Sequence, residues 1–238
     1  MKKAVFLSIG FGLAVTVAQS DSQFAAAEKA RDKADVPKLQ EWVENARQAA
    51  TGQNTASVQQ WIALLDFYLC EASYVQGKNE LIKGAAEEGF TAAEKAATLD
   101  PSSSEAHRLL GDLAVILIPY SAKGAVTYGK RSAVEADKAL ELDPKNTKAL
   151  VSRGLAYFYT PAAAGGDKQK GFELLKKAAE LDPTFDAPHT FLAQMYLSTG
   201  QKQDAVREIK EALRLNPDRR TAQMAYKTVM AATGDTGK

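Results

Sequence analysis

A pattern of apolar and charged residues that ends in proline recurs four times along the chain. The four copies occupy residues 93–101, 136–144, 175–183 and 209–217. Each copy places its apolar residues on one face of a helix, and the proline cannot continue that helix. The pattern therefore predicts four amphipathic helices, each ended by its proline, and the prolines are 43, 39 and 34 residues apart.

The repeated unit resembles the tetratricopeptide repeat, which is 34 residues long and consists of two helices. The final unit matches the signature throughout, at His189, Leu192, Ala193, Tyr196, Gly200, Ala205, Ile209, Ala212 and Pro217. The earlier units match in part, at Trp61, Leu64, Leu65 and Tyr68, at Ala106, Leu110, Gly111 and Ala114, and at Ala149, Gly154 and Tyr157. The resemblance covers about residues 55–232. It implies an all-α, right-handed superhelical solenoid, in which stacked helix pairs bury faces that one pair cannot bury alone.

The chain divides into four parts on this interpretation. Residues 1–20 are a signal peptide, and residues 21–54 form two N-terminal helices that are a cap or a degenerate repeat. Residues 55–219 hold four tetratricopeptide-like repeats, and residues 220–238 form a C-terminal capping helix and tail.

The first twenty residues have the pattern of an export signal. Lys2 and Lys3 precede an apolar run, and Ala18 and Ser20 place small residues where a signal peptidase cuts. The run is shorter than the ~20 residues that span a bilayer. We therefore expect cleavage after Ser20, no membrane span afterwards, and a periplasmic or secreted protein.

Composition narrows the function further. The chain has 30 Lys and Arg against 29 Asp and Glu, which excludes a strongly basic nucleic-acid-binding protein. One Cys and two His exclude a disulfide framework and a zinc site of four Cys and His ligands. No motif of a hydrolase or metalloprotease occurs, so we expect no catalytic residue, no metal and no cofactor. Cys70 is either a buried small residue or a reactive thiol.

The first three units are longer than the last one, by 12, 9 and 5 residues between their two helices. These additions all project from one edge of the solenoid. They either lengthen the helices or form a binding edge, as insertions on one face often do. Tyr120 and Tyr128 on this edge are candidate binding residues, and the alternative is that they belong to the core between repeats. Asp167, after two glycines, is expected to cap the next helix rather than to leave it free for a phosphate.

The resemblance also implies a concave groove lined by the first helix of each repeat. Carried to this sequence, the groove positions are Asp66, Arg108, Asp112, Val151, Leu155, Phe158, Tyr159, Thr190 and Gln194. The clamp for a C-terminal carboxylate, which chaperone-binding members of the family use, is not present. Arg108 and Asp112 are four residues apart, so they are expected to pair with each other.

Two functions remain open. One is a scaffold of the cell envelope that binds a protein or peptide partner. The other is a periplasmic accessory protein that holds a small apolar ligand beside a solute transporter. The second function requires a closed apolar cavity near Ile118, Tyr120 and Phe158, typically of ~300–1,000 Å³. Pairing of two copies of the chain is a third option.

Overall fold

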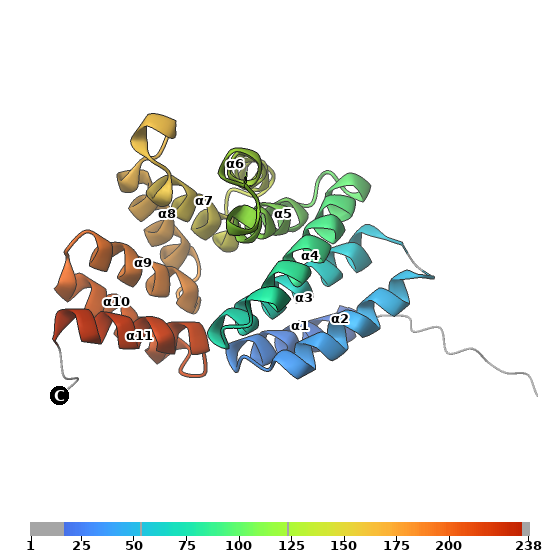
Figure 1. The fold of residues 1–238 in the computed structure, drawn as a ribbon, viewed down its shortest axis with the longest axis horizontal. Coiled ribbons are helices and arrows are strands. Elements are labelled where there is room, and N and C mark those ends of the chain that lie inside the picture. Colours follow the sequence, from blue (N-terminus) through green and yellow to red (C-terminus); the bar gives the residue numbers. More distant parts are fainter. Residues whose placement is uncertain (1–16, 53, 123, 235–238) are drawn as a thin grey trace, which may run out of the picture.

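The computed structural model describes residues 17–52, 54–122 and 124–234, and within them the protein is all-helical (Figure 1). The helices are α1 (Val17–Asp32), α2 (Val36–Ala50), α3 (Ala56–Val75), α4 (Asn79–Leu99), α5 (Ser104–Leu117), α6 (Gly124–Leu142), α7 (Thr147–Tyr159), α8 (Lys168–Leu181), α9 (Asp186–Ser198), α10 (Lys202–Leu215) and α11 (Arg220–Thr233). Two short 3₁₀ helices, η1 (Ile118–Tyr120) and η2 (Ala162–Ala164), lie in the connections after α5 and α7. Consecutive helices from α3 to α10 pack as four hairpins. The expected solenoid of helix pairs is confirmed.

The two helices of a hairpin approach closely where a glycine faces the partner helix. A Cβ atom on Gly111 of α5 would lie 3.1 Å from the backbone oxygen of Ser132 on α6. On Gly154 of α7 it would overlap Leu175 Cδ1 and would lie 3.0 Å from the backbone oxygen of Gly171, both on α8. The small residues of the signature therefore set the distance between the helices.

Local sequence fixes the start of several helices. The side chains of Thr55, Ser103, Asn146 and Asp167 each accept a hydrogen bond from the backbone N–H three residues later. Such N-caps satisfy donors that have no partner within the helix. The predicted capping role of Asp167 is confirmed, and its acceptor atom lies 3.1 Å from the nitrogen of Lys170.

The inserted residues take different forms in different repeats, and whether they form a binding edge stays a prediction. The first insertion lengthens α3 and α4 to 20 and 21 residues. The second and third form η1 and η2 with the turns around them. The two helices expected at the N-terminus are α1 and α2. The break between them lies at residues 33–35, and Pro37 follows within the first turn of α2. The predicted signal peptide lies outside the described residues except for its last four, which begin α1.

The end of the solenoid returns to its beginning. In Figure 1 the last helix, α11, lies beside the blue and teal helices, and residues of α11 contact α3. Arg219, just before α11, donates from Nη1 to Asp32 Oδ1 at 3.0 Å and from Nη2 to Glu71 Oε1 at 2.8 Å. Asn216 donates to Asp32 Oδ2 at 2.9 Å. These contacts close the described helices into a ring.

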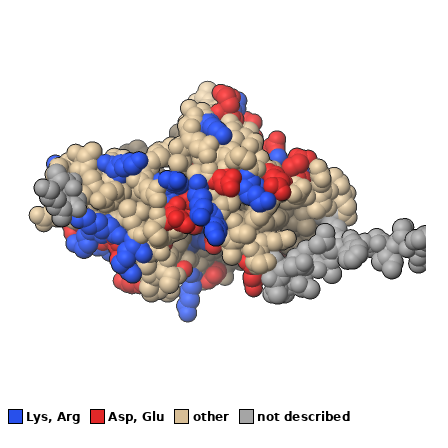
Figure 2. All heavy atoms as spheres, turned by 90° about the horizontal axis from the view of Figure 1, so that it is seen from below, with Lys and Arg blue, Asp and Glu red and all other residues tan. Residues whose placement is uncertain are grey.

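The charged side chains on the face that Figure 2 shows gather in groups separated by uncharged surface. Lys and Arg side chains lie next to Asp and Glu side chains across that face. No helix among residues 17–52, 54–122 and 124–234 is long and apolar enough to cross a membrane.

Candidate binding cavity

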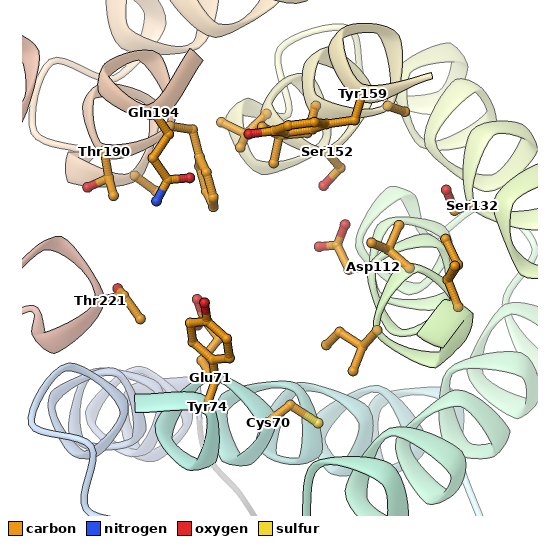
Figure 3. A pocket seen from close by; sticks show the side chains of 18 of the residues that line it. Cys70, Glu71, Tyr74, Asp112, Ser132, Ser152, Tyr159, Thr190, Gln194 and Thr221 are labelled. Atoms are coloured by element: carbon orange, nitrogen blue, oxygen red, sulfur yellow. The ribbon is translucent and has the colours of Figure 1, made fainter. Parts of the chain in front are cut away.

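The ring surrounds a cavity of about 1850 Å³ that is partly open to solvent. Residues of α3, α5, α6, α7, α9 and α11 line it, and η1 contributes Ile118, Pro119 and Tyr120. Figure 3 shows the space between these helices, with side chains from all sides directed into it. The cavity is therefore a product of the whole solenoid rather than of one repeat.

Large apolar side chains are left exposed on the cavity wall. Tyr74 is 62% exposed and Val126 is 65% exposed, and Tyr159, Val115 and Met224 are also exposed. These five residues lie on five different helices, and all line the cavity. Figure 3 shows Tyr159 and Tyr74 on opposite walls. Exposed apolar side chains that converge on one concave surface are typical of a binding site.

A buried ion-pair network on α5 forms part of the lining. Arg108 donates to both carboxylate oxygens of Glu105, at 2.8 and 2.7 Å, and to Asp112 at 2.5 Å. The predicted pairing of Arg108 with Asp112 is confirmed. Burial raises the pKa of Asp112, although the Arg108 guanidinium opposes that shift. Figure 3 shows the Asp112 carboxylate directed into the cavity opposite Ser152.

A second charged cluster lies where the ring closes. It contains Arg31, Asp32, Glu71, Asp186 and Arg219, from α1, α3, α9 and the residue before α11. Glu71 Oε2 and Asp186 Oδ2 are buried and accept no hydrogen bond from the described residues. Burial also raises the pKa of Asp186. Both carboxylates line the cavity.

The last part of the chain matches a known repeat family. The model of the tetratricopeptide repeat matches residues 162–231. These residues form tetratricopeptide repeats. No curated protein matches the chain. Solenoids of such repeats present extended concave surfaces, so the general function that the fold suggests is that of a scaffold for protein interactions.

Two solved structures show how far the fold is shared. TTC0263, a thermophilic tetratricopeptide repeat protein from Thermus thermophilus, is 17% identical, with a TM-score of 0.66 over 83% of this chain and 93% of its own. The HusA haemophore from Porphyromonas gingivalis is 18% identical, with a TM-score of 0.55 over 95% of this chain and 98% of its own. At these identities the similarity concerns the fold alone.

The structure brings most of the expected groove residues together. The cavity is lined by Arg108, Asp112, Val151, Leu155, Tyr159, Thr190 and Gln194, and by Tyr120 of the inserted edge. Phe158 and Tyr128 lie elsewhere. Phe158 is buried against Phe172 with ring centroids 5.5 Å apart, and Tyr128 packs against Phe90 at 5.7 Å. Both aromatic rings therefore pack between helices. For Tyr128 this is the alternative stated above, that it belongs to the core between repeats.

Asp66 also lies outside the cavity, because the register expected for α3 is one residue out. Its side chain is buried between helices, and Arg47 Nη2 donates to its two oxygens at 2.9 Å each. A Cβ atom on Gly89 of α4 would lie 2.7 Å from Asp66 Cβ. Asp66 therefore occupies the position that Gly111 and Gly154 occupy in later repeats.

The corrected register of α3 explains why several residues that line the cavity were not among the expected groove positions. The residues of α3 that line the cavity include Phe67, Glu71 and Tyr74. The expected register rested on Trp61, whereas the small residue of this hairpin is on the second helix, at Gly89. The right alignment of α3 follows from two residues together. Asp66 is the only charged residue within a long apolar stretch, and Gly89 on the next helix is the small residue that faces it.

The buried Asp66 makes stability depend on pH. Burial raises the pKa of Asp66 to about 7, although Arg47 opposes that shift. The usual value is about 3.9, so the folded protein binds this proton more tightly than the unfolded chain does. The stabilisation that the bound proton on Asp66 gives to the folded protein is therefore complete below about pH 4, and it is lost as the pH rises to about 7.

Asp66→Asn is expected to remove this dependence. The difference in free energy of unfolding between the variant and the wild type should be about 2 kcal/mol more favourable to the variant above pH 7 than near pH 4. The reason is that a neutral side chain carries no penalty for buried charge. Urea denaturation at pH 4.5 and 8 measures the difference. Asp137→Asn, at an exposed site, is the control. An unchanged pH dependence in Asp66→Asn would contradict the prediction.

The two histidines and the cysteine have structural roles. His107 Nδ1 lies 2.5 Å from Glu135 Oε2, and His189 Nδ1 lies 2.7 Å from Glu208 Oε2, each within a hairpin. Cys70 is buried, and burial raises the pKa of its thiol, which disfavours the reactive thiolate. Among the described residues no three His, Cys, Asp or Glu side chains are placed to hold a metal ion.

Proposed function

We propose that the protein is an exported, non-catalytic binding protein of the cell envelope whose central cavity encloses an amphipathic ligand. The five exposed apolar side chains that converge on the cavity carry the proposal. Fully burying one such side chain is worth about 1.5–3 kcal/mol, and an apolar ligand would bury several together. The pattern of residues 1–20 supports a periplasmic or secreted location, where such a protein serves as an accessory to solute transport.

The ring closure by Arg219 supports this function over an open scaffold, because it adds a wall to the cavity. The expectation for a ligand carrier is met only in part, since Ile118 and Tyr120 line the cavity but Phe158 does not, and the cavity is partly open to solvent. HusA, which is a haemophore, has the same fold over nearly the whole chain and is compatible with this use of the fold.

A peptide segment of a partner protein is the second candidate. The volume of about 1850 Å³ favours it, because pockets for small molecules are typically ~300–1,000 Å³. Most of the lining also comes from the positions that form the concave groove in tetratricopeptide repeats. Self-association stays a prediction, and a molar mass from light scattering equal to the monomer would reject it.

The first experiment compares two valines on the same helix. Val126 and Val134 of α6 are 65% and 62% exposed, but only Val126 lines the cavity. The neutral apolar probe N-phenyl-1-naphthylamine is titrated into residues 21–238, and its fluorescence reports binding. We expect Val126→Glu to weaken the probe at least tenfold and Val134→Glu to change its affinity less than twofold.

The result decides between the candidates in two steps. Equal effects of the two substitutions, or no binding of the probe, would refute binding in the cavity. If the cavity binds the probe, mass spectrometry of molecules released from the purified protein then distinguishes a small ligand from a peptide.

A further inference from the structure

We propose that the cavity binds a ligand with a positively charged group, which Glu71 and Asp186 engage while the apolar wall holds the rest of the molecule. The inference rests on the proposed function, since it concerns the chemistry of the ligand in the same cavity. It comes from the hydrogen bonds of the cluster where the ring closes.

The hydrogen bonds of the two arginines in this cluster leave two carboxylate oxygens without a donor. Arg219 uses Nη1 for Asp32 and Nη2 for Glu71 Oε1, and its Nε donates to Thr221 Oγ1 at 2.9 Å. Arg31 donates from Nε and Nη2 to Asp32 Oδ1, at 2.9 and 2.8 Å. The arginine nitrogens therefore do not satisfy the remaining carboxylate oxygens.

Two buried acceptors remain without a donor, on residues that line the cavity. Glu71 Oε2 is 3.9 Å from Arg31 Nε, and Asp186 Oδ2 is 4.0 Å from Arg219 Nε, both beyond hydrogen-bond distance. Asp186 is only 5% exposed. A buried polar atom without a partner costs about 1–3 kcal/mol, and more when it is charged. A donor group on the ligand would remove this cost.

The charge of the cluster determines the kind of donor. Arg31 and Arg219 face three carboxylates, those of Asp32, Glu71 and Asp186, so the cluster has one unbalanced negative charge when all are ionised. Glu28 and Lys148 beside it cancel each other, with Lys148 Nζ 3.8 Å from Glu28 Oε1. An ammonium or guanidinium group supplies both the missing charge and several N–H donors.

The surroundings of the two carboxylates determine the rest of the ligand. Tyr74 lies three residues after Glu71, on the same face of α3, and Figure 3 shows both side chains directed into the cavity. The exposed Tyr159 faces them from α7. A ligand whose charged end reaches Glu71 would place its apolar body between these rings, so the class indicated is a cationic amphiphile.

A matched series of eight-carbon amphiphiles tests the inference. Octylammonium, 1-octanol and octanoate compete with N-phenyl-1-naphthylamine for residues 21–238. We expect octylammonium to displace the probe at a concentration at least tenfold lower than octanoate does. Glu71→Gln should reduce this preference to less than threefold and leave displacement by 1-octanol unchanged, since glutamine keeps an oxygen for Arg219 but loses the charge.

Two controls keep the test decisive. Glu87→Gln removes a carboxylate at an exposed position of α4 outside the cavity and should leave the series unchanged. Asp186→Asn should act in the same direction as Glu71→Gln, and thermal denaturation verifies that each variant is folded. If the probe does not bind, the proposed function fails. If the probe binds but octylammonium and octanoate displace it equally, or if Glu71→Gln has no effect, the cation inference alone is overturned.

Discussion

Replacing Arg219 with alanine is expected to lower the free energy of unfolding by about 3–5 kcal/mol and to open the ring. Arg219 is 6% exposed and holds Asp32 and Glu71, residues that lie 187 and 148 positions away along the chain. Removing one partner of a buried ion pair leaves the other charge uncompensated, and this typically costs about 3–5 kcal/mol. Asp32 would keep its bonds from Arg31 and Asn216, whereas Glu71 Oε1 loses its donor and Asp186 loses a neighbouring positive charge.

Urea denaturation measures the stability change, and small-angle X-ray scattering measures the opening as a larger radius of gyration. Arg220→Ala is the matched control. Arg220 follows Arg219 directly, is exposed, and donates to Gln223 of its own helix. It should change stability by less than about 0.5 kcal/mol. Arg219→Lys should recover part of the loss, since lysine keeps the charge but lacks the planar fork that reaches two acceptors. Equal stability of the alanine variant and the wild type would show that the ring closes without this contact.

Leu175→Ala is expected to cost about 2–5 kcal/mol, the range for truncating a buried leucine. Leu175 is fully buried on α8 and packs where Gly154 brings α7 close. The neighbouring helices are held at that distance by backbone contacts at Gly154 and Gly171, so they have little freedom to fill the space. The hairpin also carries Tyr159 and Val151 of the cavity wall, so Leu175→Ala should weaken binding of the probe as well as lower stability.

Leu181→Ala provides the comparison within the same helix, because Leu181 is exposed at its end. Its cost should be below about 1 kcal/mol, since little buried surface is lost. Denaturation curves of the two variants under identical conditions check the difference. A cost for Leu175→Ala no larger than that for Leu181→Ala would mean that the α7–α8 hairpin packs differently from the structure.

The positions of the cavity residues were predictable where the repeat signature was clear. In the last two units Val151, Leu155, Thr190 and Gln194 line the cavity as the family positions implied. In the first unit the same transfer failed at Asp66, because its glycine lies on the second helix instead of the first. A shift of one residue rotates a helical position by about 100°, which moves a side chain from the cavity to the hairpin interface.

The sequence by itself determined the helices, their pairing and the repeat architecture, because proline stops, N-caps and the period of apolar residues act within one or two turns of chain. Only the tertiary structure decided the closure of the ring, the cavity and the cluster of Arg219, Glu71 and Asp186. These depend on the rotation that accumulates from one helix pair to the next, and on contacts such as Arg219 with Asp32, between residues 187 positions apart. No local pattern contains the sum of those rotations, and so the site lies where the two ends of the solenoid meet.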